Sequence, residues 1–259
     1  MDTIRVERDA RGVATLWLAR AEKHNALSAQ MMTEIEAAAG ELARDESVRV
    51  VVLAAEGPTF CAGGDLAWMR EQFGMDAETR KRESRRIAGA MGALAALPQP
   101  LIGRIHGNAF GGGVGLAAVC DVSIGATGIR MGFTEVRLGL IPANIGPFVI
   151  ARMGAVRARE VFMNARIFDA DEAMRLDLLN RVVAPEDLDA AVEAEVAPYL
   201  TCAPFAVREA KALLNELAGR VTPEQVDHAI EALAIRWQSD EAQEGISAFF
   251  DKRKAPWAG

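Results

Sequence analysis

The sequence has few of the residues that mark several common classes of protein. Its 259 residues include three cysteines, three histidines and one tyrosine, and aromatic residues make up 6% of the chain. Three cysteines cannot build a disulfide framework, which indicates a reducing compartment. Basic residues number 29 and acidic residues 36, so the formal net charge is −7. This charge disfavours a general role in binding nucleic acid.

Long hydrophobic runs are also absent. No stretch of ~20 apolar residues is free of charge, so we expect no membrane-spanning segment and no membrane partner. Residues 1–11 are charged throughout and lack the apolar region of a secretory signal. Together with the low cysteine content, these absences predict a cytoplasmic protein.

Small and aliphatic residues dominate what is present. Apolar residues make up 51% of the chain and glycine occurs 23 times. This apolar fraction excludes intrinsic disorder. The length suits one large domain, or a core with an appendage. A core of this composition allows polypeptide backbones to approach one another closely.

The hydrophobic pattern predicts an α/β protein whose character changes near Gly154. Before that residue, predicted strands alternate with helices and with glycine-containing loops. The predicted strands are 13–18, 48–55, 101–105, 121–126 and 129–133. Helices are expected at 29–44, 82–96 and up to about residue 119, and 66–81 is expected to be irregular. Beyond Gly154 the pattern predicts helices at 155–163, 171–177, 186–199, 204–218 and 223–238.

Histidine, cysteine and serine offer weak catalytic candidates. No two histidines have the spacing of a metal site, so we expect no metal ion. His106 precedes a glycine-rich loop and either has a structural role or lines a ligand cleft. Cys61 has no evident histidine partner and is interpreted as a small buried thiol. The sequence around Ser123 lacks the first glycine of a nucleophile elbow.

Two glycine-rich loops after predicted buried strands are more informative. Residues 62–65 (Ala-Gly-Gly-Asp) form the first loop, and residues 111–115 (Gly-Gly-Gly-Val-Gly) precede a predicted helix. The start of a helix offers unpaired N–H groups to a phosphate or to a developing oxyanion. The two loops could direct N–H groups at one oxygen atom. Alternatively, the glycines only form tight turns that require positive φ.

Residues 113–118 also fit the dinucleotide-binding pattern G-x-G-x-x-A, and Glu135 follows Gly115 by 20 residues. This alternative predicts a nicotinamide-dependent oxidoreductase. The pattern begins at residue 113, which is late in the chain for such a domain. In addition, two short strands separate it from Glu135, whereas a dinucleotide-binding unit has one helix and one strand there. The alternative also leaves the loop at 62–65 unexplained. The sequence contains no Gly-Lys-Ser/Thr, so it has no P-loop.

An ordered set of segments resembles the enoyl-CoA hydratase/isomerase family, also called the crotonase superfamily. The segments span nearly the whole chain: EKHNAL at 22–27, FCAGGD at 60–65, GNAFGGG at 107–113, CD at 120–121, FTEVRLGLIP at 133–142 and GISAFFDKRK at 245–254. Each segment alone is weak, but the ordered set is specific. The region from Glu135 to Phe148 is most similar to the branch of methylglutaconyl-CoA and related branched, carboxylated enoyl-CoA hydratases.

The resemblance implies a fold and an assembly. Residues 1–195 would form a spiral of ββα units that binds acyl-CoA and carries catalysis. Residues 196–259 would form a helical oligomerisation region that builds a homotrimer, often within a dimer of trimers. No separate cofactor is implied, because coenzyme A is part of the substrate.

The resemblance also assigns roles to individual residues. The backbone N–H groups of Gly64 and Gly112 would form the oxyanion hole for the thioester oxygen, and Glu135 would act as the acid/base. The positions implied to bind CoA are Lys23, Ala62, Asp65, Phe249 and Lys252, of which the last two would reach a CoA bound with a neighbouring subunit.

One position departs from the family pattern. Typical hydratases with two acids carry a second glutamate two residues after the triple glycine, where this sequence has Gly115. The implied activity is addition of water to a 2-enoyl-CoA with Glu135 as the main acid/base. Water, His106, Asn108 or Asn144 would take the second role. The alternatives are an enoyl-CoA isomerase, which needs a single acid/base, and a non-catalytic acyl-CoA binder.

Overall fold

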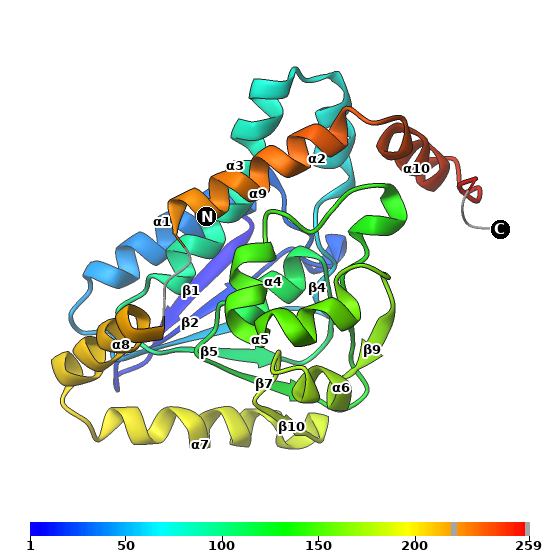
Figure 1. Ribbon diagram of the computed structural model, residues 1–259. Coiled ribbons are helices and arrows are strands. Elements are labelled where there is room, and N and C mark those ends of the chain that lie inside the picture. Colours follow the sequence, from blue (N-terminus) through cyan, green and yellow to red (C-terminus); the bar gives the residue numbers. More distant parts are fainter. Residues whose placement is uncertain (219–221, 257–259) are drawn as a thin grey trace.

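Two β-sheets form the core of the computed structural model, which describes residues 1–218 and 222–256 (Figure 1). The larger sheet has the strand order β1-β2-β3-β5-β7-β10, and the smaller sheet the order β4-β6-β8-β9. All neighbouring strands are parallel except the pairs β1–β2 and β8–β9. The strands are β1 (Ile4–Arg8), β2 (Val13–Leu18), β3 (Val50–Ala55), β4 (Thr59–Cys61), β5 (Leu101–Ile105), β6 (Asn108–Phe110), β7 (Val122–Ala126), β8 (Arg130–Gly132), β9 (Ile167–Asp169) and β10 (Arg181–Val183).

The chain repeatedly passes from the larger sheet to the smaller sheet and then into a helix. β3 and β4 lead to α2 (Leu66–Glu71) and α3 (Ala77–Ala95), and β5 and β6 lead to α4 (Gly112–Ala118). β7 and β8 lead through the 3-10 helix η3 (Glu135–Leu138) to α5 (Gly146–Val161). This winding confirms the predicted α/β spiral of ββα units. Because β4, β6 and β8 are parallel neighbours, the loops that follow them meet at one end of the smaller sheet.

Elements with a strong local pattern lie where the sequence predicts them. Every residue of β3 is buried, because β2 and β5 pair with it on both sides and helices cover the sheet. Helix α1 (Ala29–Arg44) begins where the Ser28 hydroxyl accepts the N–H of Met31. Strand β5 and helix α8 (Pro204–Ala218) also have the predicted bounds.

The segment 66–81 is ordered, in contrast to the prediction. It forms α2, the 3-10 helix η2 (Gln72–Gly74) and the first turn of α3. Asp65 and Asp76 begin the two α-helices by accepting backbone N–H groups with their carboxylates. Many residues of this segment are charged and exposed, so its few apolar residues show no clear helical periodicity in the sequence.

Several short elements were not predicted. The prediction lacks strands β1, β4, β6, β9 and β10, because three to five residues show little pattern of their own and depend on the strands that pair with them. It also lacks a helix at 240–250. Helix α5 begins at Gly146 and not near 155, and it is interrupted at Gly154, whose φ is +69°. The remaining helices are α6 (Ala170–Arg175), η4 (Pro185–Asp187), α7 (Leu188–Leu200), α9 (Pro223–Trp237) and α10 (Asp240–Phe250), with η1 (Ala21–Lys23) near the N-terminus.

The predicted domain boundary after residue 195 falls inside a continuous helix. Helix α7 extends to Leu200 and packs against β5 and β7 of the larger sheet, so it belongs to the core. Helix α9 packs on α3, and α10 packs on η3 (Figure 1). The last two helices therefore cover this chain's own core. Within residues 1–218 and 222–256, no helix is long and apolar enough to cross a membrane.

Candidate active site

The two glycine-rich loops lie against each other. A Cβ atom added to Gly113 would lie 2.3 Å from the carbonyl oxygen of Cys61, and one added to Gly63 would lie 2.9 Å from that of Phe110. Leu27 joins the first loop by a parallel bridge, in which its N–H donates to the Gly63 oxygen and its carbonyl oxygen accepts the N–H of Asp65. The glycines are therefore required because two backbones meet, and Gly63, with φ of +97°, also needs its conformational freedom.

Gly64 and Gly112 contribute backbone to one cavity. The cavity has a volume of about 90 Å³, and both glycines line it. In the part of the chain that the structure describes, neither N–H group has a hydrogen-bond acceptor. Two glycines with unpaired N–H groups, one from each loop, thus line the same small cavity.

Glu135 lines the same cavity with an unpaired carboxylate oxygen. Its Oε2 atom is buried and has no hydrogen-bond partner, and its Oε1 atom lies 2.8 Å from the position that a Cβ atom on Gly111 would occupy. The glycine at 111 leaves room for this carboxylate. Burial raises the pKa of Glu135 to about 7. A carboxyl group with this pKa can both take and release a proton near neutral pH.

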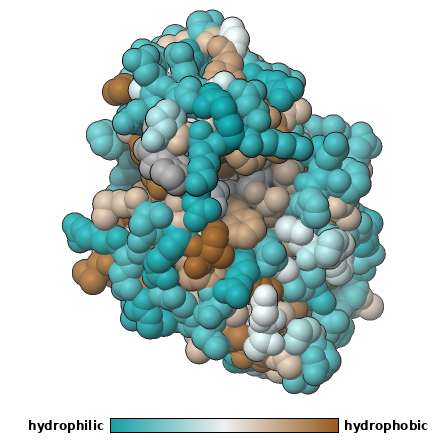
Figure 2. All heavy atoms as spheres, turned by 90° about the vertical axis from the view of Figure 1, so that its right-hand side faces the viewer, coloured by the Kyte–Doolittle hydropathy of each residue, from teal (hydrophilic) through white to brown (hydrophobic). Residues whose placement is uncertain are grey.

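The remaining walls of the cavity are largely apolar. They come from α2, η2, α3, the segment after η3, and α9. Among the lining residues are Trp68, Met69, Ile87, Leu140, Ile145, Leu233 and Trp237. The face of the molecule toward α10 shows apolar side chains near its centre, bordered by hydrophilic ones (Figure 2). Apolar walls around a few unpaired polar groups are typical of a ligand site.

The residues predicted to bind CoA fall into three settings. Lys23 and Ala62 are both exposed, and the Ala62 N–H donates to the carbonyl oxygen of His24, so these two segments are neighbours. Phe249 and Lys252 are exposed at the end of α10. Asp65 is buried, and its carboxylate serves the fold itself.

Asp65 fixes the start of α2. Its Oδ1 atom accepts the N–H groups of Ala67 and Trp68, and its Oδ2 atom lies 2.9 Å from Nη2 of Arg20. These contacts lower the pKa of Asp65, although its burial alone would raise it. The side chain therefore positions α2 next to the cavity and has no free oxygen directed at a ligand.

Of the side chains proposed for the second catalytic role, Asn144 lines the cavity. Its Oδ1 atom is buried without a partner. His106 and Asn108 do not line this cavity. The ring of His106 bonds through Nε2 to the Gly57 oxygen, and Asn108 accepts the N–H of Arg130. Both serve the loops around β6.

Gly115 lies behind the cavity wall. A Cβ atom at this position would lie 2.5 Å from Cγ2 of Ile145 and 3.3 Å from Cε of Met91. Ile145 is itself a lining residue. The space that a second catalytic carboxylate needs is therefore occupied by the Ile145 side chain.

The dinucleotide alternative does not fit this structure. All seven residues of α4 are buried, and Gly113 packs directly on Cys61. The turn therefore has no open side on which a pyrophosphate could lie. Within the two described ranges, no group of three or more His, Cys, Asp or Glu side chains is arranged to hold a metal ion.

Sequence reasoning missed Gln72, Ser84 and most of the apolar walls. Gln72 and Ser84 are buried polar residues that line the cavity, and both belong to or follow the segment predicted to be irregular. The apolar stripe of the predicted helix 223–238 includes Leu233 and Trp237, but only the tertiary structure shows that the stripe faces this cavity.

Comparisons with known proteins found relatives that match nearly the whole length of the chain. The family model for enoyl-CoA hydratase/isomerase matches residues 8–259. A protein of Syntrophomonas wolfei named crotonyl-CoA hydratase is 33% identical, over 94% of this chain and 93% of its own. An enoyl-CoA hydratase structure from Mycobacterium avium superposes with a TM-score of 0.88 at 30% identity and covers 99% of this chain and 100% of its own. One from Mycobacterium smegmatis gives 0.81 at 36% identity, with 100% of both chains covered. The chain belongs to the enoyl-CoA hydratase/isomerase family, the crotonase superfamily.

Proposed function

We propose that the protein catalyses the reversible syn addition of water to a 2-enoyl-CoA thioester. One observation carries this proposal: Glu135, whose Oε2 atom is unpaired, lines the same small cavity as Gly64 and Gly112, whose N–H groups have no acceptor. The two N–H groups are the oxyanion hole of the proposal. They would bind the thioester oxygen, on which negative charge develops during the reaction. Removing one such donor from an enzyme typically costs ~3–4 kcal/mol of transition-state stabilisation.

Glu135 alone can carry both proton transfers. Its carboxylate takes a proton from water, and the water oxygen forms a bond to the β-carbon while the double bond shifts toward the thioester. The resulting enolate is held by Gly64 and Gly112. The protonated Glu135 then delivers the same proton to the α-carbon. Hydrogen and hydroxyl are added on the side that faces Glu135, so the addition is syn.

Asn144 is expected to hold the reacting water. Its buried Oδ1 atom needs a donor, and it borders the cavity that Glu135 enters. Asn144→Leu should lower kcat for hydration about tenfold, the effect of one lost hydrogen bond. His106→Leu is the matched control, because His106 lies outside this cavity, and kcat should stay near that of the wild type. Equal losses in both variants would contradict the role of Asn144.

The buried carboxylate predicts a simple dependence of activity on pH. The ionised form of Glu135 starts the reaction, and burial raises its pKa to about 7. We expect kcat/KM for hydration to rise about tenfold per pH unit below pH 7 and to level off above it. A pH series that follows the ultraviolet absorbance of the conjugated thioester measures this. A profile that is flat across this range would contradict the assignment.

The isomerase is the second candidate, and the position of Ile145 favours it. Isomerisation requires one base that moves a proton between the α- and γ-carbons, and Ile145 leaves no space for a second acid at Gly115. Incubation with a 3-enoyl-CoA and identification of the products separates the two activities. A 3-hydroxyacyl-CoA formed rapidly from a 2-enoyl-CoA supports the hydratase. Binding of CoA esters without turnover would contradict both.

The acyl chain is proposed to be branched or carboxylated. The similarity of the segment from Glu135 to Phe148 to the methylglutaconyl-CoA branch supports this part of the proposal. The segment after Leu138 contributes six consecutive lining residues of the cavity, Leu140 to Ile145, so it is placed to contact the acyl group. A panel of enoyl-CoA esters with straight, branched and carboxylated chains tests this preference.

The roles of Lys23, Ala62, Phe249 and Lys252 along the CoA, and assembly into trimers or dimers of trimers, are also proposals. Exposed apolar side chains on α8 support assembly: Phe205, Leu213, Leu214 and Leu217 are each more than half exposed. An apolar face of this kind is commonly covered by a partner surface. Sedimentation equilibrium should give the mass of three or six chains, and a monomer would contradict the assembly.

A further inference from the structure

Two buried N–H donors near the active-site cavity have no acceptor. Gln72 in η2 is 1% exposed and lines the cavity, and its Nε2 atom has no hydrogen-bond partner. The Nε atom of Arg80, in the first turn of α3, is also buried without a partner. Buried donors that remain unpaired cost free energy, and native proteins keep few of them. Both residues line a cavity, so a bound ligand is able to supply the missing acceptor.

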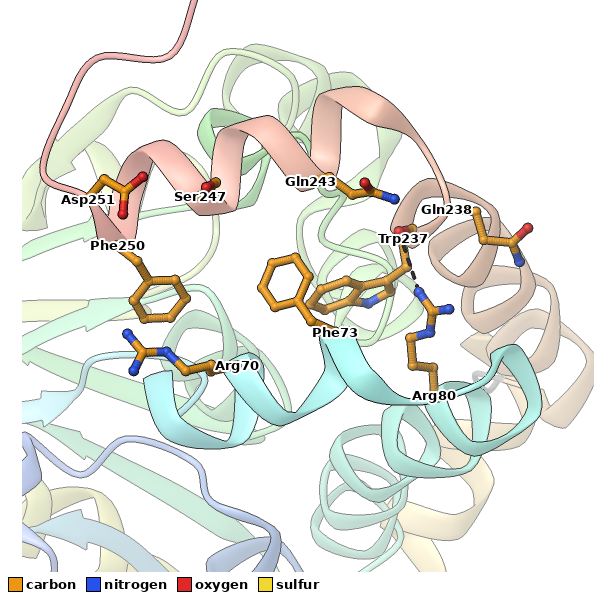
Figure 3. A pocket seen from close by; sticks show the side chains of 9 residues that line it. All are labelled: Arg70, Phe73, Arg80, Trp237, Gln238, Gln243, Ser247, Phe250 and Asp251. Carbon is orange, nitrogen blue, oxygen red and sulfur yellow. Dashed lines mark hydrogen bonds between the residues drawn. The ribbon is translucent and has the colours of Figure 1, made fainter.

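Arg80 lines a second cavity that adjoins the first. This cavity has a volume of about 610 Å³ and lies between the segment from α2 to α3 and the helices α9 and α10 (Figure 3). Trp237 lines both cavities. In addition, Arg70 and Phe73 of the second cavity directly follow Met69 and Gln72 of the first in the chain. Trp237 is thus the wall that the two cavities share, and an acyl group that reached past its side chain from the first cavity would enter the second.

The aromatic and backbone contacts hold the guanidinium of Arg80 at the cavity wall. Its Nη1 atom donates to the backbone oxygen of Trp237 at 3.4 Å (Figure 3). The ring of Phe73 packs edge-on against Trp237, with 5.6 Å between the ring centroids. Arg70 lies over the ring of Phe250 at 4.3 Å. The lining of this cavity thus combines two cationic side chains with aromatic surface.

The charges of the two cavities differ. Glu135 is the one ionisable residue among those that line the first cavity. The second is lined by Arg70 and Arg80 against a single acid, Asp251. A carboxylate on the substrate would be repelled by ionised Glu135 if it stayed in the first cavity. Of the two cavities, the second is the one that cations line.

We propose that Gln72 and Arg80 together recognise a carboxylate at the far end of the substrate's acyl chain. The Gln72 amide donates to it from the first cavity, and the Arg80 guanidinium donates to it and balances its charge from the second. The enzyme then prefers a 2-enoyl-CoA with a terminal carboxylate over one that ends in a methyl group. This inference rests on the proposed enoyl-CoA hydration and specifies its substrate class.

The test compares two substrates of equal chain length, one 2-enoyl-CoA with a terminal carboxylate and one with a terminal methyl group. The wild type should favour the carboxylated ester in kcat/KM. Gln72→Met and Arg80→Met should each reduce the ratio of the two kcat/KM values by about 10- to 100-fold, as expected when a hydrogen bond to a charged group is lost.

Two matched controls separate recognition from folding. Arg82 is exposed on the same helix and outside both cavities, so Arg82→Met should leave the ratio at the wild-type value. Gln99 is a second buried glutamine, but its Nε2 atom donates to the Leu42 oxygen at 2.7 Å. Gln99→Met should lower the melting temperature without changing the ratio. Gln72→Met should not lower it, because it removes an amide that has no partner.

Three results would overturn the inference, and they differ from a failure of the proposed function. An unchanged ratio in both the Gln72 and Arg80 variants would exclude recognition of the acyl chain. Equal losses of kcat/KM for the two substrates would assign these residues to CoA. A wild-type preference for the methyl-ended ester would exclude a carboxylate. If the wild type hydrates neither ester, the proposed hydration itself fails.

Discussion

Glu135→Gln should lower kcat/KM for hydration of crotonyl-CoA by about two to four orders of magnitude, the usual contribution of a general acid–base. Glutamine keeps the size of the side chain but cannot exchange a proton with water or with the α-carbon. The substitution leaves Gly64 and Gly112, the proposed oxyanion hole, unchanged, so binding of CoA esters should persist. Loss of the ultraviolet absorbance of the enoyl thioester measures the rate. Near-full turnover in this variant would contradict the role of Glu135.

Stability provides an independent readout for the same variant. Burial raises the pKa of Glu135 from 4.5 to about 7, so the folded state binds the proton more tightly than the unfolded state. The stability from this proton is fully present below pH 4.5 and is lost as the pH rises to about 7, by a total on the order of 3 kcal/mol. The Glu135→Gln variant has no carboxyl group to ionise, so it keeps its stability as the pH rises and should be more stable than the wild type above pH 7. Glu41→Gln on the exposed face of α1 should change neither rate nor stability.

Gly115→Glu should destabilise the protein and should not add a second catalytic acid. The new Cβ atom would lie 2.5 Å from Cγ2 of Ile145, which is branched at its own Cβ and cannot move away freely. Overpacking of this kind typically costs ~1–3 kcal/mol, and a buried carboxylate without a partner adds to the cost. Denaturant unfolding measures the stability, and the hydration assay measures the rate.

Two further variants test whether the contact with Ile145 causes the destabilisation expected for Gly115→Glu. Ile145→Ala combined with Gly115→Glu removes the obstructing side chain, so the double variant should recover part of the lost packing energy. Gly40→Glu adds the same side chain in helix α1, where the new Cβ atom has only Arg44 Nη1 nearby, at 3.6 Å, and it should be tolerated. A Gly115→Glu protein that is as stable as the wild type and hydrates faster would show that position 115 accepts a second acid.

The site residues differ in how far the sequence around them indicates their roles. The loops at 62–65 and 111–115 stand out in the sequence because strands of buried aliphatic residues precede them, although the glycines alone do not distinguish a binding loop from a tight turn. Glu135 was identified only through resemblance, since an acidic residue after a short strand is ordinarily a surface charge. The raised pKa of Glu135 follows from burial by distant segments, which the residues around it in the sequence do not reveal.

The sequence also did not reveal what surrounds the site, because these contacts again involve residues from distant segments. Asp65 belongs to a family motif, yet its carboxylate is used by Arg20 and by the start of α2. The glycine at 115 was noted as a missing acid, but only the structure shows Ile145 in that space. Gln72 gave no signal, since its segment is rich in charged residues and has little visible periodicity.

The sequence by itself determined the class of fold, the strands and helices with strong periodicity, the two glycine loops and the ordered motifs of the family. These follow from local pattern, because burial on one face or on both leaves a regular trace along the chain. The tertiary structure decided which loops meet, which carboxylate stays unpaired, and which side chains close the cavity. Those properties arise from contacts between residues far apart in the sequence, such as Gly113 with Cys61 and Trp237 with Phe73. No local pattern contains them.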